Sequence, residues 1–262
     1  MPNTASVLDL ISVTKRFVAP DGVSQLTAIE QVTMNVRAGE FVAVVGPSGC
    51  GKSTILNLVS GLDRASEGRI VLNGAPVTGP NPSVGFMLQK DLLLPWRTIV
   101  SNVEFGLEAR GLSAAERRER ALRELKRCRL DDFANSYPYQ LSGGMRQRAA
   151  LARTLAIEPA IVLLDEPFSA LDAQTKMILQ KSFAQTIASE GITTVLITHD
   201  LLEAATMSDR ILVMSERPGR IIDEIIVDLP DRDNPMARMH QPKVKQYVDR
   251  LMATLHLEEK VA

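Results

Sequence analysis

Short segments in which apolar residues alternate with polar ones or follow one another without interruption predict strands. These segments are residues 7–13, 33–37, 40–45, 68–74, 83–89, 160–166, 192–198 and 210–214. Several of them are nearly continuous Val, Ile and Leu runs, which is typical of parallel strands buried on both faces. Helical patterns lie between them, so the chain is expected to form a mainly parallel sheet covered by helices, an α/β fold.

Helical character predominates from about residue 91 to residue 157. Ser113 and Glu116 have the spacing of a capping box, which predicts the start of a helix. We expect one domain that carries this helical segment as an insertion. Its expected parts are a core of about residues 1–90 and 158–230, an N-terminal antiparallel β part within that core, a helical subdomain of about 91–157, and a tail of 231–262 with a helix from Lys243 to Leu257.

Composition narrows the function classes. The 262 residues include 30 basic and 31 acidic side chains, a formal net charge of −1, so the chain lacks the basic excess of a nucleic-acid-binding protein. No run of about 18 apolar residues predicts a membrane span, and the first ten residues show no secretory pattern. Two cysteines do not form a disulfide framework. We therefore expect a cytosolic protein.

The most specific motif fits the phosphate-loop pattern G-x-x-x-x-G-K-[ST] between a predicted strand and a predicted helix. Glycines let successive N–H groups point at one anion, and the helix adds its positive end. Lys52 can reach the β- and γ-phosphates of ATP, and the Ser53 hydroxyl can ligate Mg²⁺. A glycine-rich turn that matches by chance is the alternative, which the strand–loop–helix context disfavours. The candidate nucleotide-binding residues are Gly46, Pro47, Ser48, Gly49, Cys50, Gly51, Lys52, Ser53 and Thr54.

Two carboxylates end the apolar run at 161–164. Parallel strands deliver their last residues to the sheet edge where ligands bind. There Asp165 can hold Mg²⁺, which prefers oxygen ligands, and Glu166 can orient or deprotonate an attacking water. The alternative is that both residues cap the following helix.

Two further segments place polar groups at strand or helix ends. Ser142, Gly143 and Gly144 precede Met145 at the start of a predicted helix, where they could bind an anion or form only a helix cap. His199 follows the strand at 192–198, where it could hydrogen-bond a phosphate oxygen or be an ordinary capping residue.

Taken in order, these motifs resemble those of the ATP-binding-cassette (ABC) ATPases from about Leu8 to Asp228. The resemblance also includes Gln89 and the Ser169–Asp172 sequence Ser-Ala-Leu-Asp. No Asn-Lys-x-Asp sequence is present, which disfavours a guanine-specific GTPase. The resemblance implies a P-loop NTPase fold, ATP and Mg²⁺ as ligands, and an ATPase that pairs head to tail with a second copy of itself.

The resemblance also implies roles for individual residues. Residues 142–145 would form the signature motif that completes the site of the other copy, and Asp172 would line the dimer seam. Gln89 would approach Mg²⁺ and the attacking water, and His199 would contact the γ-phosphate. Phe17 would stack on adenine, although a strand-end Phe can also be simply core. Met145 departs from the commonest signature, which has Gln at this position.

A finer resemblance points to importers of the nitrate, sulfonate and taurine type, on residues 86–96, 140–148 and 215–220. It implies membrane permease partners, an indirect link to a solute-binding protein, and a place on the cytoplasmic face of a bacterial inner membrane. No nucleic-acid partner is expected. The alternatives are a soluble ABC ATPase that acts on nucleic acid or ribosomes, and a cassette that binds ATP without hydrolysing it.

Two residues carry specific expectations. Trp96, in the sequence Leu92-Leu93-Leu94-Pro95-Trp96, is expected to help form the groove that receives a permease helix, unless this segment is an internal core turn. Cys50 lies at a helix N-terminus beside Lys52, which should favour its thiolate. We therefore expect alkylation of Cys50 to inactivate the protein and bound ATP to protect it.

Overall fold

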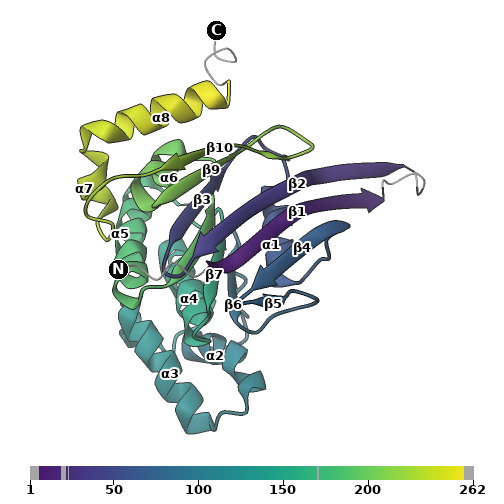
Figure 1. Ribbon diagram of the computed structural model, residues 1–262. Coiled ribbons are helices and arrows are strands. Elements are labelled where there is room, and N and C mark those ends of the chain that lie inside the picture. Colours follow the sequence, from purple (N-terminus) through teal and green to yellow (C-terminus); the bar gives the residue numbers. More distant parts are fainter. Residues whose placement is uncertain (1–5, 19–21, 23, 170, 257–262) are drawn as a thin grey trace.

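The computed structural model describes residues 6–18, 22, 24–169 and 171–256. It contains a six-stranded sheet and a four-stranded antiparallel sheet, with helices packed against them (Figure 1). In the six-stranded sheet every neighbouring pair is parallel except the last, β9 with β10. Its strands, in spatial order, are β6 (Val84–Met87), β7 (Ile161–Asp165), β8 (Thr193–Ile197), β3 (Phe41–Val45), β9 (Arg210–Met214) and β10 (Ile221–Ile226).

The apolar runs seen in the sequence form the buried centre of this sheet. Every residue of β3, β8 and β9 is buried, and so are the four aliphatic residues of β7. Parallel strands covered on both faces need apolar side chains at every position, which explains why these segments do not alternate. The expected α/β fold is confirmed.

The antiparallel sheet packs over the first helix. Its strands, in spatial order, are β2 (Gln25–Arg37), β1 (Ser6–Val18), β4 (Glu67–Leu72) and β5 (Ala75–Pro76). Apolar side chains of β1, β2 and β4 join those of α1 (Lys52–Ser60) and of β3, β7 and β8 in one buried cluster. The helix that follows the phosphate loop is therefore held between the two sheets.

A helical region covers another side of the parallel sheet. Its α2, α3 and α4 pack against one another, and α3 begins with the predicted capping box between Ser113 and Glu116. The elements of this region are α2 (Ile99–Glu104), η1 (Phe105–Arg110), α3 (Ala114–Arg127), η2 (Asp131–Phe133), η3 (Pro138–Gln140) and α4 (Gly143–Ala156). Residues 91–98 form no helix, and the first helix of this region begins at Ile99.

The remaining helices follow β7 in the sequence. They are α5 (Ala173–Glu190), α6 (Leu201–Met207), α7 (Pro235–Met239) and α8 (Pro242–Thr254). Two of them, α6 and α8, pack against β3, β9 and β10. Val244 and Leu251 of α8 pack with residues of α6, β9 and β10, and α8 lies at the opposite end of the molecule from α3 (Figure 1). The helix predicted from Lys243 to Leu257 is present but ends at Thr254, and Leu257 lies outside the described residues. Within the described ranges, no helix is long and apolar enough to span a bilayer.

Arg210 links the two sheets through its guanidinium group. It donates to both carboxylate oxygens of Glu40 at 2.8 and 2.9 Å, to Glu224 of β10 at 3.1 Å, and to the backbone oxygen of Asn35 of β2 at 2.6 Å. Only 4% of Arg210 is exposed. A planar fork of donors suits this arrangement, and truncation of Arg210 would leave a largely buried Glu40 without its partner.

We therefore expect Arg210→Ala to lower the free energy of unfolding by about 3–5 kcal/mol, the usual cost of breaking a buried ion pair. Urea denaturation would measure the change. Arg220→Ala is the matched control, because Arg220 pairs with Glu30 on the surface and such pairs contribute about 0–1 kcal/mol. Equal stability of the two variants would contradict this role for Arg210.

Candidate functional site

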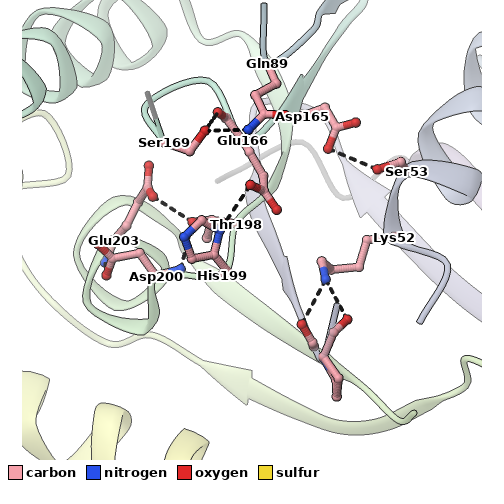
Figure 2. A network of polar contacts seen from close by, with 12 residues as sticks. Lys52, Ser53, Gln89, Asp165, Glu166, Ser169, Thr198, His199, Asp200 and Glu203 are labelled. Carbon is pink, nitrogen blue, oxygen red and sulfur yellow. Dashed lines mark hydrogen bonds and ion pairs between the residues drawn. The ribbon is translucent and has the colours of Figure 1, made fainter. Parts of the chain in front are cut away.

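The candidate site lies at the edge where four parallel strands end. The phosphate loop follows β3, Gln89 follows β6, Asp165 ends β7, and His199 comes shortly after β8. The strand register pairs Asp165 with Ile197, and Val44 with Ile197, so these ends lie at the same level. Figure 2 shows how their side chains converge from separate parts of the sequence.

Lys52 is held inside the phosphate loop. Its ammonium group donates to the backbone oxygens of Gly46 at 2.8 Å and Pro47 at 2.9 Å, and only 7% of the residue is exposed (Figure 2). The N-cap of α1, Gly51, provides no side-chain cap. The first N–H groups of a helix have no intrahelical acceptor, so this end of α1 combines unpaired donors with a positive charge, as an anion site requires.

A cavity of about 390 Å³ lies over this loop. Ser53 and Glu166 line it, and so do Phe17 and Leu26. Phe17 is 39% exposed, and the Lys15 ammonium lies 4.8 Å from its ring centroid. The ring is therefore only partly covered and borders the cavity, rather than being an ordinary core residue. The other described residues that line it are Ala28, Ser48, Gly49, Gly51, Lys52, Thr54 and Arg217.

Ser53 and Asp165 contact each other across the site. The Ser53 hydroxyl donates to Asp165 Oδ1 at 3.2 Å. Burial raises the pKa of the Asp165 carboxyl above its ordinary value; the Ser53 hydrogen bond opposes this and the charge of Glu166 adds to it. A hydroxyl and a carboxylate side by side are hard oxygen ligands of the kind that Mg²⁺ uses when it keeps most of its waters. These two residues fit such an ion.

Glu166 directly follows β7 with an unusual backbone conformation. Its φ of 47° lies in the left-handed region, which non-glycine residues rarely adopt, and its N–H donates to Ile197 O at 2.9 Å. His199 Nδ1 lies 3.1 Å from Glu166 Oε2. The arrangement joins a carboxylate to an imidazole beside the phosphate loop, which suits proton transfer to or from a water.

Gln89 connects this edge to the helical region. Its Nε2 donates to Ser169 Oγ at 3.0 Å, and Ser169 Oγ donates to Glu166 O at 2.9 Å. Its backbone oxygen accepts from Gln147 Nε2 of α4 at 3.0 Å. Gln89 is thus hydrogen-bonded to Ser169 and to Gln147 of α4. Among the described residues, it has no hydrogen bond to Ser53 or Asp165, the two residues with which we expected it to bind Mg²⁺.

A second network behind His199 was not anticipated from the sequence. Lys176 of α5 donates to Asp200 Oδ2 at 2.8 Å and lies 3.5 Å from Glu203 Oε2. Glu203 Oε2 also accepts from Thr198 Oγ1 at 2.6 Å (Figure 2). Burial raises the pKa of Glu203, although the Thr198 and Lys176 contacts oppose it. The network ties the residues on either side of His199 to the first turns of α5.

The signature residues lie apart from the phosphate loop. Ser142 caps α4 by accepting from Met145 N at 3.3 Å, and Asp172 caps α5 by accepting from Thr175 N at 3.0 Å. Thr175 also packs against Gly144, where an added Cβ would lie 2.4 Å from Thr175 Cγ2. The structure therefore brings the signature and Asp172 together, at a separate cavity of about 200 Å³ that none of the described phosphate-loop residues line.

Met145 packs partly buried against the main core cluster and borders this second cavity. Of the seam sequence, Ala170 lies outside the described residues. A larger cavity of about 610 Å³ lies between the ends of α3 and α5 and Arg232, and it contains none of the residues selected from the sequence.

The segment around Trp96 is not simply an internal turn. Trp96 is 72% exposed and Leu92 is 53% exposed, whereas Leu93 is buried. Beside it, a cavity of about 570 Å³ is lined by Gln89, by residues 90–93 and by the start of α4. Arg146 Nε pairs with Asp91 at 3.1 Å at this cavity. An apolar surface next to Gln89 is therefore available.

The expectation of a reactive thiolate at Cys50 was wrong. Cys50 is 1% exposed, and burial raises the pKa of its thiol, while Lys52, 3.9 Å away, opposes this only in part. Proximity to a helix N-terminus and a lysine is outweighed because the side chain points into the core cluster with α1 and not into the cavity.

Comparison with known proteins places these motifs in a family. Residues 29–169 match the family model described as ABC transporter. An uncharacterized ABC transporter ATP-binding protein of Methanocaldococcus jannaschii, MJ0412, is 47% identical over 206 residues, which cover 79% of this chain and 77% of that protein.

Two further relatives carry transport names. A taurine import ATP-binding protein, TauB, of Yersinia pestis is 43% identical and covers 78% of this chain and 80% of its own length. A nitrate import ATP-binding protein, NrtD, of Synechocystis is 39% identical and covers 96% of both chains. Among solved structures, a dimeric post-hydrolysis state of the ATP-binding cassette MJ0796 bound to ADP and Pi has a TM-score of 0.73 and 35% identity, covering 85% of this chain and 99% of that one.

Both cysteines should resist alkylation in the folded protein. Burial raises the pKa of Cys128 to about 12, with Glu124 adding to the shift, and it raises that of Cys50. A raised thiol pKa lowers the thiolate fraction at neutral pH, and the thiolate is the reactive form. We expect neither thiol to react with a chromogenic disulfide reagent at pH 7.5 until denaturant is added, after which both react. Rapid native modification that ATP prevents would restore the reactive Cys50 inferred from the sequence.

Proposed function

The chain belongs to the ABC transporter family, and from this premise we propose that it is the ATP-hydrolysing subunit of a bacterial ABC importer. The observation that carries the proposal is the meeting of Lys52, Asp165 and Glu166 at one sheet edge, under a cavity that also reaches Phe17. These are the groups needed to hold a nucleoside triphosphate and to direct a water at its last phosphate.

The chemistry follows from the geometry of these residues. The loop from Gly46 to Thr54 binds the phosphates through its N–H groups, and Lys52 exchanges its backbone acceptors for phosphate oxygens. Glu166 orients the attacking water and accepts its proton, and His199, 3.1 Å away, contacts the γ-phosphate and steadies the carboxylate. Phe17 stacks on the adenine at the outer end of the cavity.

Mg²⁺ would be held by Ser53 and Asp165, and when bound it would neutralise charge on the phosphates. Gln89 is coupled to the catalytic carboxylate residue, because Ser169 connects the Gln89 amide to the Glu166 backbone. Its link to Gln147 then transmits the state of the site to α4. We also propose that the chain divides into three parts. They are a core of about residues 1–90 and 158–230, a helical subdomain of about residues 91–157, and a tail of residues 231–262.

The complete site is formed by two copies in a head-to-tail dimer. Ser142, Gly144 and Met145 line a cavity that none of the described phosphate-loop residues line, which supports their acting, with Gly143, on the nucleotide of a second copy. Asp172 is connected to them by Thr175, whose N–H donates to Asp172 and whose side chain packs against Gly144. Asp172 would face the dimer seam. The dimeric MJ0796 cassette bound to ADP and Pi is consistent with this arrangement.

The cavity beside Trp96 is proposed as the docking groove for a membrane permease. The exposed Leu92 and Gln89 line it, and the exposed Trp96 lies on the same segment as Leu92, so a helix seated there could respond to the nucleotide. A protein that docks in this way lies on the cytoplasmic face of the bacterial inner membrane and reaches a solute-binding protein only through the permease. The taurine and nitrate names of the relatives support a small anionic or zwitterionic solute.

The alternative, a soluble ABC ATPase that acts on nucleic acid or ribosomes, is not favoured. The net charge of −1 provides no electrostatic attraction to phosphate backbones. A cassette that binds ATP without hydrolysing it is disfavoured because Lys52, Asp165, Glu166 and His199 are all present at the sheet edge.

Copurification from native membranes tests the transport assignment. We expect the tagged chain, extracted in mild detergent, to bring with it a multi-helix permease identified by mass spectrometry, and Trp96→Ala to reduce its recovery at least about fivefold because an aromatic anchor is lost. Ile226→Ala is the control, since Ile226 is 61% exposed on β10, at the opposite edge of the sheet. Recovery of ribosomal proteins or nucleic acid in place of a permease would contradict the proposal.

A further inference from the structure

The segment from Ser215 to Arg220, which connects β9 to β10, packs directly against the phosphate loop. Gly219 donates to Ala28 O and accepts from Glu30 N, both at 3.0 Å, so the segment is bonded to β2. A Cβ added at Gly219 would lie only 2.0 Å from Cys50 O. The backbone of the segment is thus in contact with the backbone of the phosphate loop, which leaves no room for a side chain between them.

Arg217 extends from this segment onto the loop. Its Nε and Nη2 atoms donate to the same acceptor, Gly49 O, at 3.1 and 2.9 Å. The side chain is exposed, and it lines the 390 Å³ cavity together with Phe17 and Lys52. A guanidinium group is always charged and offers five donors, so two bonds to one carbonyl leave it able to bind an anion as well.

The segment is also held by contacts that do not involve Arg217. The Gly219 bonds fix one side of it, Ser215 N donates to Arg220 O at 2.9 Å, and Arg220 pairs with Glu30. An exposed, charged side chain that lines a cavity suited to phosphates has the properties of a ligand-binding group.

We propose that Arg217 is a further nucleotide-binding residue, which contacts the phosphates common to ATP and ADP while it fixes the Gly49 carbonyl. The inference rests on the proposed function, because it takes the cavity over the phosphate loop to be the nucleotide site. Gly49 O is the acceptor of Arg217, whereas Glu166 and His199 pair with each other, so Arg217 acts on binding and not on the hydrolysis step.

Nucleotide titrations of the full chain test this assignment. We expect Arg217→Ala to weaken the affinities for ATP and ADP to a similar extent, about tenfold, and to raise the KM for ATP about tenfold with kcat within about twofold of wild type. Arg217→Lys should recover part of the loss, since it keeps the charge but not the fork. The matched control is Arg220→Ala, three residues away on the same segment, which should leave affinity within about twofold.

The possible results separate a failure of the Arg217 inference from a failure of the proposed function. Affinities of Arg217→Ala equal to those of wild type would overturn the inference and leave the proposed function standing. Equal weakening by Arg220→Ala would show a packing role for the segment and also overturn it. Failure of the wild-type chain itself to bind ATP would contradict the proposed function and remove the inference with it.

Discussion

Parallel pairing of β6, β7, β8 and β3 is the constraint on which the rest of the structure depends. Because these neighbours run in the same direction, Gln89, Asp165, His199 and the phosphate loop all emerge at one edge of the sheet. The central strands β3 and β8 are buried along their whole length, and the register pairs both Asp165 and Val44 with Ile197, so the strand ends lie at the same level. The positions of the charged residues are therefore a consequence of apolar packing at the centre.

The same edge brings Lys52 and the positive end of α1 close to two carboxylates. Lys52 is nearly buried and uses two backbone oxygens as acceptors, and α1 begins without a side-chain cap. Burial raises the pKa of the Asp165 carboxyl, which disfavours its ionised form. A cation held by Ser53 and Asp165 would oppose this effect of burial, because it favours the carboxylate. Phosphates and a divalent cation together would satisfy both halves of the site, which is why we regard nucleotide binding as its function.

The parts of the protein that could be predicted from the sequence are those set by local pattern. The phosphate loop, the capping box at Ser113 and the buried strands each depend on neighbouring residues, and all were found where expected. The contacts that were missed join distant residues: 168 positions separate Gly49 from Arg217, and 24 separate Lys176 from Asp200. Cys50 was misjudged because its burial depends on packing against both sheets, which spacing along the chain does not reveal.

The most direct test of the central claim is the behaviour of Glu166→Gln with ATP and Mg²⁺, measured by phosphate release and by size-exclusion chromatography with light scattering. The account predicts that hydrolysis falls about 10²–10⁴-fold, the usual contribution of such a base. It also predicts that the variant elutes as a dimer with ATP and as a monomer with ADP, because ATP then stays bound between two copies. Wild-type hydrolysis by the variant, or a monomer under both conditions, would contradict an ATP site completed by a second chain.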